Sequence, residues 1–184
     1  MTEKEKMLAV ELYNALDRQL AEERRRTRNR LKDFNDSHDE EQEKRARILK
    51  ELLHKAGRNL WIEPPFFCDY GSNITVGDNV YFNFNCVVLD VAPMRIGSNV
   101  LCGPNVQIYT ASHPLNFGLR REGLECGELI EIGDDVWIGG GSIICPGVKI
   151  GSRSVIGAGS VVTKDVPPGV LAFGNPCRVV RELE

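Results

Sequence analysis

The sequence feature that most limits the fold is a six-residue period of apolar side chains over the C-terminal two thirds of the chain. The longest unbroken run consists of Ile132, Ile138, Ile144, Ile150, Ile156 and Val162. An α-helix repeats every 3.6 residues and a strand every two, so neither element alone produces this period. It fits a solenoid of triangular coils in which each of three short flat sides uses one hexapeptide. The sequence therefore predicts a mainly β protein built as a parallel β-helix.

The residues around these apolar positions support the same coil. The fourth residue after each is small or β-branched: Val136, Ser142, Val148, Ser154, Ser160 and Val166. Earlier blocks repeat the period: Ile96, Cys102 and Ile108, and before them Val76, Phe82 and Val88. We expect these side chains to point inward and stack in layers, with Gly or Asn where the corners need unusual backbone angles. The period does not reveal the hand of the coil, although parallel crossovers are right-handed in almost all other folds.

The period fails over residues 113–129, HPLNFGLRREGLECGEL, a segment that we call the excursion. It is rich in polar and charged residues and contains three glycines. A solenoid coil does not need such a segment, and long insertions into repeats often line binding surfaces. We therefore expect function to gather where the excursion leaves the coil.

The first 57 residues differ from the body, because they are dense in charge and contain no glycine before Gly57. Leu8, Leu12, Leu16 and Leu20 lie four apart, which predicts one stripe of a helix. A second helix is predicted from Asp39 to about Lys55, with Gly57 as its stop. We therefore divide the chain into an N-terminal α-helical segment, 1–57, and a β-helix domain with a C-terminal tail, 58–184.

Charge and cysteine content exclude several classes of protein. The net charge of −3 offers no field for nucleic acid or an anionic membrane, and acidic residues interrupt the basic run Arg24–Arg30. No apolar run approaches the roughly 20 residues of a membrane span, and the charged N-terminus does not resemble a secretory signal. The six cysteines include no C-x-x-C pair, which favours buried thiols over disulfides or zinc. These features predict a cytoplasmic protein.

Several segments of the chain resemble a known family. They are CDYGSNI (68–74), YFNFNCVVLD (81–90), RIGSNVLCGPNVQIYTASHP (95–114), IGDDVWIGG (132–140), VVTKDVP (161–167) and NPCRV (175–179). They resemble the maltose and galactoside O-acetyltransferases, which are hexapeptide-repeat acyltransferases, and the N-terminal TEKEKM and ELY look like the maltose branch. The resemblance implies a left-handed β-helix, a homotrimer with active sites between neighbouring subunits, and direct transfer of acetyl from acetyl-CoA to a sugar hydroxyl without a metal.

Acyl transfer to a hydroxyl needs a base and a donor to the oxyanion that forms on the thioester carbonyl. His113 is the only histidine of the β-helix domain, lies at the break in the period, and matches the family base within TASHP. A histidine side chain titrates close to neutral pH, as such a base must. The resemblance assigns Asn83 to the reacting centre. It also suggests that Glu125 steadies the imidazole, as a carboxylate does in catalytic triads.

The predicted acceptor pocket contains polar groups from both parts of the chain. They are Asp69, Tyr81, Asn14, Asp17 and Arg24. The chain departs from the galactoside branch, which has serine in place of Asp69 and an aspartate in place of Val91. We therefore expect a glucose- or maltose-type acceptor.

The predicted acetyl-CoA groove follows the later coils. Its candidate residues are Trp137, Gly139, Gly140, Ser142, Ala158, Gly159, Thr163, Lys164, Arg178 and Arg181. We expect Trp137 to protrude from a turn and pack on the pantetheine arm. Backbone N–H groups of 139–142 would donate to the thioester carbonyl, and the cations would meet phosphates.

Three alternatives stay open at this point. The acceptor could be another small hydroxyl or an amine such as that of serine, or the chain could be a β-helix scaffold that has lost activity. A zinc enzyme of the same fold would need three histidines in the β-helix domain, which contains only His113.

Overall fold

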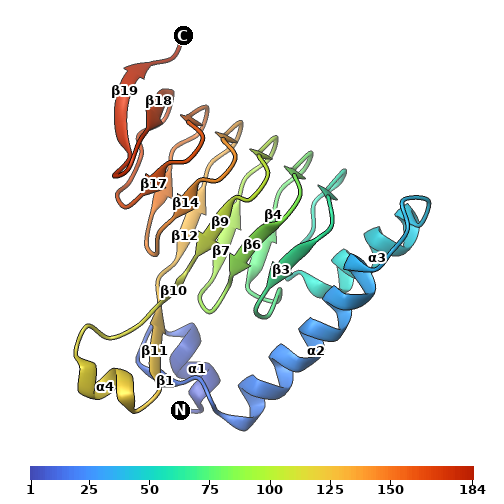
Figure 1. Ribbon diagram of the computed structural model, residues 1–184, viewed down its shortest axis with the longest axis vertical. Coiled ribbons are helices and arrows are strands. Elements are labelled where there is room, and N and C mark those ends of the chain that lie inside the picture. Colours follow the sequence, from blue (N-terminus) through green and yellow to red (C-terminus); the bar gives the residue numbers. More distant parts are fainter.

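The computed structural model describes all 184 residues and shows a three-sided parallel β-helix closed at its N-terminal end by helices (Figure 1). Strands from successive coils lie above one another in three sheets. Face 1 contains β4 (Ile74–Val76), β7 (Met94–Ile96), β12 (Ile130–Ile132) and β15 (Lys149–Ile150). Face 2 contains β2 (Trp61–Ile62), β5 (Tyr81–Phe82), β8 (Leu101–Cys102), β13 (Trp137–Ile138), β16 (Val155–Ile156), β18 (Val170–Phe173) and β19 (Arg178–Glu182). Face 3 contains β3 (Phe66–Cys68), β6 (Cys86–Leu89), β9 (Gln107–Tyr109), β14 (Ile143–Ile144) and β17 (Val161–Val162).

The apolar residues of the six-residue period stack in layers, as the sequence predicted. Ile132 lies between Ile96 and Ile150 on face 1, and Ile138 lies between Cys102 and Ile156 on face 2. All of these side chains belong to one hydrophobic core of 33 buried residues. Because each short strand alternates in and out, its other residue faces away from the prism. Each sheet thus presents a row of outward side chains with one member from each coil.

The corner between faces 1 and 2 depends on glycines that let successive coils touch through their backbones. A Cβ at Gly97 would lie 2.7 Å from the carbonyl carbon of Gly133 and 2.8 Å from the nitrogen of Asp134. The same corner holds Asn79, Asn99 and Asp135 with positive φ, a conformation that Asn and Asp tolerate. Their side chains form a ladder, with Asn79 Nδ2 donating to Asn99 Oδ1 at 3.1 Å and Asn99 Nδ2 donating to Asp135 Oδ1 at 2.9 Å.

The N-terminal segment differs from the sequence prediction. It contains α1 (Glu3–Leu8), β1 (Tyr13–Asn14), α2 (Arg18–Asn35) and α3 (Gln42–Leu52). The predicted leucine stripe was wrong, because Leu8, Leu12 and Leu16 are exposed and only Leu20 is buried. The chain leaves the helix after α1 since Tyr13 is fully buried and pairs as a strand with the excursion.

The predicted second helix exists but is shorter. α3 ends at Leu52, and Gly57 is required for another reason: a Cβ there would lie 2.0 Å from the carbonyl oxygen of Gly77. Leu31, Phe34 and Leu49 from α2 and α3 join the core of the solenoid. The boundary at residue 57 therefore separates two kinds of structure that share one core.

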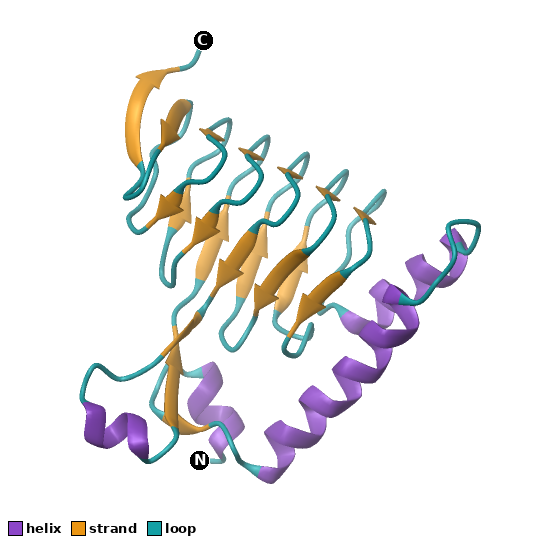
Figure 2. Cartoon of the chain, in the orientation of Figure 1, coloured by secondary structure: helices purple, strands orange, loops and turns teal.

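The excursion forms a hairpin that extends away from the prism. It consists of β10 (Ala111–Ser112), α4 (Phe117–Arg121) and β11 (Leu124–Gly127), which lie beside α1 and β1 at the lower edge of Figure 2. At the other end of the solenoid, β18 and β19 pair in antiparallel fashion. No helix has the length and apolar character that crossing a membrane would need.

The glycine corner gives a first prediction. Gly97→Ala should lower the free energy of unfolding by about 1–3 kcal/mol, because the new methyl group would overlap backbone atoms of the next coil. Melting temperature at fixed protein concentration is the measurement. Gly118→Ala in α4 is the control and should change stability by about 0.5 kcal/mol or less, since its Cβ would meet only the Asn116 side chain, at 3.0 Å. Equal melting temperatures for the two variants would contradict this account of the corner.

Candidate active site

The candidate base lies on the excursion, opposite a glutamate that is held from the other side. β10 pairs with β11 so that Ser112 is opposite Cys126, and one further step of this register brings His113 opposite Glu125. On its other side Glu125 pairs with Tyr13 of β1, whose hydroxyl donates to Glu125 Oε2 at 2.9 Å. Glu125 and His113 are thus brought together as neighbours, and the hydrogen bond that the structure records for the Glu125 carboxylate comes from Tyr13.

Tyr13 is a site residue that the sequence did not reveal. Its side chain is fully buried, and burial, followed by the nearby Glu125 carboxylate, raises the pKa of its hydroxyl far above the usual range. The hydroxyl therefore stays protonated and keeps donating to Glu125. The pair joins residues 112 positions apart, so no local pattern could have shown it.

Asp69 lies at the corner between faces 3 and 1, on the same side of the molecule as Glu125. Burial raises the pKa of the Asp69 carboxyl; the positive charge of Arg24 opposes this and the negative charge of Glu125 adds to it. The side chain borders a groove of about 340 Å³ between α2 and face 3. Its lining residues are Arg28, Leu31, Lys32, Asn35, Phe67, Cys68, Asp69 and Leu89.

Arg24 connects the helical segment to this corner. Its guanidinium donates to the Tyr70 hydroxyl and to the Ala15 carbonyl oxygen, the latter at 2.6 Å, and lies 5.6 Å from the centre of the Tyr70 ring. Val91, the position at which the chain departs from the galactoside branch, packs with Tyr13 and Tyr70 in a small apolar cluster. The wall beside Asp69 is therefore apolar where a second carboxylate was lost.

Two predicted acceptor residues have other partners. The Asp17 carboxylate caps α2, accepting the N–H groups of Gln19 and Leu20, so its prediction as a sugar ligand is corrected to a helix cap. Asn14 remains exposed in β1, and its side-chain oxygen accepts the N–H of Leu16.

Asn83 lies at a different corner, between faces 2 and 3. Its side-chain oxygen accepts the Phe84 N–H at 2.7 Å, which leaves the amide NH₂ free to donate outward. Tyr81 precedes it on face 2, in the same outward row as Trp137. Trp137 lies in strand β13 and not in a turn as predicted, and its side chain is exposed.

The later coils continue the Asn83 corner with the predicted glycines. The N–H groups of Gly139, Gly141 and Ser142 already donate to backbone oxygens, so Gly140 has the only N–H of the four without a protein partner. Ser142 is buried, with its hydroxyl donating to Gly157. Ala158 and Gly159 are exposed one coil further on, where the Gly159 N–H donates to the Gly140 carbonyl.

The predicted phosphate ligands lie at the C-terminal end. Lys164 and Arg178 line one cavity of about 240 Å³, and Thr163 and Arg181 are exposed near it in sequence. Lys164, Arg178 and Arg181 take part in no salt bridge, which leaves their charges available to an anion.

The predicted residues therefore form two groups on opposite edges of face 3. His113, Glu125, Asp69 and Arg24 gather at the corner with face 1; we call this group the acceptor half. Asn83, Gly140 and Ala158 follow the corner with face 2, and with Trp137 they form the donor half. At about 3.3 Å per residue, the six steps from Asn83 to Leu89 span roughly 20 Å.

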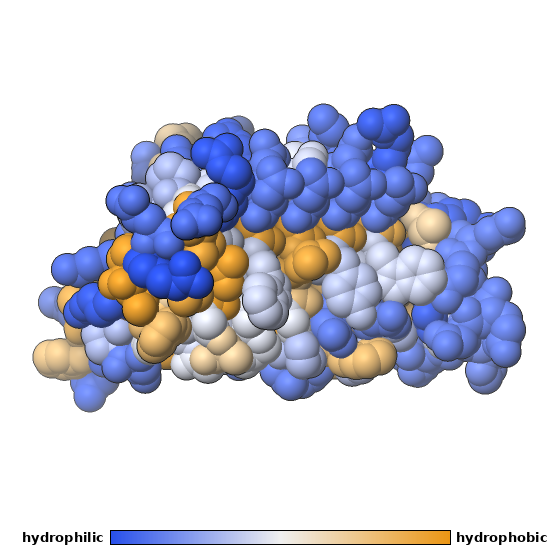
Figure 3. Space-filling view, turned by 90° about the horizontal axis from the view of Figure 1, so that it is seen from above, coloured by the Kyte–Doolittle hydropathy of each residue, from blue (hydrophilic) through white to orange (hydrophobic).

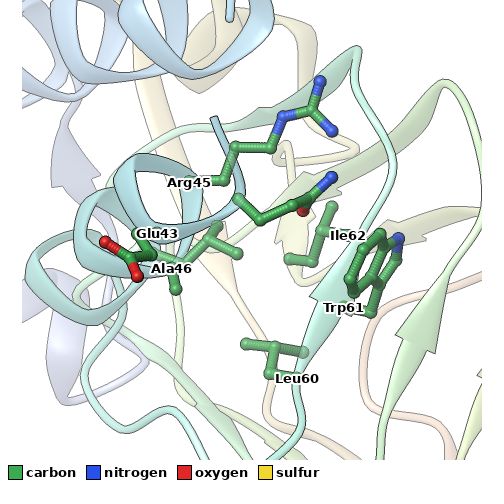
Figure 4. A pocket seen from close by; sticks show the side chains of 8 residues that line it. Glu43, Arg45, Ala46, Leu60, Trp61 and Ile62 are labelled. Atoms are coloured by element: carbon green, nitrogen blue, oxygen red, sulfur yellow. The ribbon is translucent and has the colours of Figure 1, made fainter. Parts of the chain in front are cut away.

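A separate cavity contains none of the predicted residues. It has a volume of about 270 Å³ between α3 and β2 and is lined by side chains such as Arg45, Leu60 and Trp61 (Figure 4). Arg45 is buried there and is already bound to Ser37 and Asp39. This cavity reports how α3 packs on the first coil.

Comparison with known proteins agrees with this geometry. Residues 6–57 match the maltose acetyltransferase hexapeptide capping motif, and residues 130–164 match the bacterial transferase hexapeptide (six repeats). The galactoside O-acetyltransferase of Escherichia coli strain K12 is 46% identical over 97% of this chain and 92% of its own. A maltose O-acetyltransferase structure from Clostridium difficile 630 superposes with a TM-score of 0.99 at 51% identity, covering 100% of this chain and 98% of that one.

The chain belongs to the maltose and galactoside O-acetyltransferase family. The predicted left-handed β-helix and the predicted acetyltransferase class are thereby confirmed. A further family structure, a hexapeptide-repeat acetyltransferase from Vibrio cholerae O1 biovar eltor, was solved with acetyl-CoA. It is 41% identical with a TM-score of 0.92 and covers all of both chains.

The Tyr13–Glu125 contact gives a second prediction. Tyr13→Phe removes the hydroxyl but keeps the buried ring, so Glu125 loses its donor and its orientation beside His113. We expect kcat/KM for the sugar to fall about 5- to 30-fold, in line with one hydrogen bond to a charged group. Thiol release from acetyl-CoA at varied sugar concentration is the measurement. Tyr109→Phe serves as the matched control on face 3, and equal kcat/KM values for the two variants would exclude the role given to Tyr13.

Proposed function

We propose that this protein transfers the acetyl group of acetyl-CoA to a hydroxyl of a glucose- or maltose-type sugar, with His113 as the general base. The observation that carries the proposal is the placement of His113 on the excursion, beside Glu125 and on the same corner as Asp69. Family membership supplies the reaction class and acetyl-CoA as the donor. The acceptor and the base are the proposal's own content.

The proposed reaction needs no covalent enzyme intermediate, because a thioester is already activated. His113 takes the proton of the sugar hydroxyl as its oxygen attacks the thioester carbonyl. The free amide NH₂ of Asn83 and the unpaired N–H of Gly140 are the available donors to the oxyanion. Collapse of the intermediate forms the ester and expels the CoA thiolate, which receives the proton from the imidazolium.

The acceptor would lie between Asp69, Arg24 and Asn14, with Tyr81 supplied from face 2. Carboxylate and guanidinium groups match the planar hydrogen-bond demand of sugar hydroxyls. The apolar wall made by Val91 supports a glucose- or maltose-type sugar over a galactoside. A different small hydroxyl or amine acceptor is the alternative.

The proposed donor would follow the corner between faces 2 and 3. Trp137 offers an exposed ring to the pantetheine arm, while Ala158 and Gly159 leave room for it. Lys164, Arg178 and Arg181 carry unpaired charges for the phosphates, and Thr163 lies beside them.

A homotrimer would bring the two halves together. Because roughly 20 Å of face 3 separates them within one chain, a single copy cannot complete the site. A cyclic assembly joins different surfaces of each copy, which places the donor half of one copy against the acceptor half of the next.

The outward rows of side chains favour such an assembly. The row on face 2 includes Trp61, Leu101 and Trp137, and that on face 3 includes Phe67 and Ile143. Face 1 instead presents Glu131 paired with Arg95 and Lys149. Figure 3 shows apolar and weakly polar side chains gathered along the solenoid between hydrophilic ones. Two apolar faces and one charged face suit a trimer in which face 1 meets solvent.

A thiol-release assay tests the proposed chemistry. With acetyl-CoA and glucose or maltose the protein should release CoA, and His113→Ala should lower kcat at least about 100-fold, the contribution of a general base. His54→Ala, on the exposed surface after α3, should retain its turnover. Release with serine or an amino sugar but not with glucose, maltose or galactosides would favour the alternative acceptor. No release with any of them would refute the proposal.

Mixed trimers test the shared site. His113→Ala and Asn83→Ala are each expected to be nearly inactive alone. In a cyclic trimer refolded from equal amounts of both, about one quarter of the sites pair an intact acceptor half with an intact donor half. Activity should therefore return to about a quarter of the unmodified level. Mixtures that stay inactive, while each variant remains trimeric, would place both residues in one chain's site.

A further inference from the structure

The structure contains a buried carboxylate without a positively charged partner directly behind the acceptor half. Asp90 is fully buried at the corner between faces 3 and 1 and takes part in no salt bridge. Its Oδ1 accepts the N–H groups of Asp69 at 3.0 Å and Tyr70 at 2.9 Å, and its Oδ2 accepts that of Asn73 at 3.3 Å. The Asn73 side chain donates back to the Asp90 carbonyl at 2.6 Å.

The backbone turn that Asp90 holds carries several groups of the acceptor half. Asp69 begins the turn, and Tyr70 follows with its hydroxyl accepting from Arg24. The Tyr70 carbonyl also accepts the Thr27 hydroxyl of α2 at 2.9 Å. The direction of the Asp69 side chain and the docking of α2 therefore depend on one set of backbone N–H groups.

A neutral side chain closes the same corner one coil further on. There the Thr110 hydroxyl accepts the Ala92 N–H at 2.9 Å and donates to the Leu89 carbonyl at 2.8 Å. A buried carboxylate loses much of its hydration, so it is a costly way to close a turn. The choice of a charged group at Asp90 thus points to a demand beyond closure, namely three N–H groups fixed by one side chain.

We propose that Asp90 is the positioning residue of the acceptor half, and that its charged carboxylate fixes the turn that aims Asp69 and Arg24 at the sugar. The proposal rests on the acceptor role given to Asp69 above. The donor half lies at the opposite edge of face 3 and shares none of these hydrogen bonds. Loss of the carboxylate should therefore weaken the sugar and spare acetyl-CoA.

The proposal implies a pH dependence of sugar binding. Burial raises the pKa of Asp90 to about 7, the N–H donors lower it, and the Asp69 carboxylate adds to the rise. The ionisable groups on the elements around it are Cys68, Asp69 and Tyr70 of the preceding coil, Arg24 of α2 and Glu125 of the excursion. Protonation removes acceptor capacity, so the N–H groups are held less firmly as the pH falls.

Asp90→Asn tests the role, since it keeps the size of the side chain but replaces one acceptor oxygen with a donor. We expect KM for the sugar to rise about 5- to 30-fold at pH 8 while KM for acetyl-CoA changes less than about twofold. In the unmodified protein KM for the sugar should rise as the pH falls from 8 to 6, and in Asp90→Asn this rise should be absent.

The control is Ser154→Ala, which removes a buried hydroxyl that donates to Pro167 in the last coil. It should lower the melting temperature without separating the two KM values. Equal changes in both KM values for Asp90→Asn, or an unchanged pH profile, would overturn the positioning role. If Asp90→Asn does not fold, the pH profile of the unmodified protein decides, because a sugar KM that is flat from pH 8 to 6 overturns it too. Absence of thiol release with every sugar in the unmodified protein would instead refute the proposed function.

Discussion

The close stacking of one coil on the next is the constraint on which the rest of this structure depends. Backbone atoms of Gly97 and Gly133 approach each other so closely that no side chain fits between them. This contact holds successive strands at hydrogen-bonding distance, and it is why the apolar residues align in layers such as Ile96, Ile132 and Ile150. A prism with so regular an interior offers no cavity for a substrate. Function has to lie on its corners and on the segments that leave it.

The proposed chemistry uses two corners that border the same sheet. One corner carries the excursion and the carboxylates, and the other carries Asn83 and a row of small residues. The separation explains why the listed cavities of a single copy do not reveal a complete site, and why the cavity in Figure 4 belongs to helix packing. It also gives trimer formation a chemical role, since the reaction would need surfaces from two copies.

The sequence predicted the solenoid well because its signal is periodic and each hexapeptide repeats the same physical demand. Ile138 and Ile144 lie where the period places them. The helical segment was predicted less well, since Leu8 to Leu20 follow a helical spacing while the burial of Tyr13 imposes a strand. Trp137 was placed in a turn because a two-residue strand has no alternation long enough to detect.

Site residues were predictable where a motif marks them and invisible where only long-range contacts do. His113 and Asp69 came from the resemblance and from the break in the period. Tyr13 and Asp90 act through partners elsewhere in the fold, and neither stands out by residue type or spacing. Asp17 shows the opposite case, because an aspartate before a helix is as easily explained by capping as by binding.

The fixed spacing between coils also sets a scale for any molecule that lies along the prism. Each coil advances the corner by about 4.8 Å, the distance between neighbouring strands in a sheet. A linear ligand bound along Asn83, Gly140 and Ala158 is therefore measured in whole coils. Removing the hexapeptides between Ile138 and Ile156 would shorten the track by one such step and leave the excursion intact. Chain length in this fold is thus a means of matching a cofactor's length, separate from the choice of sugar.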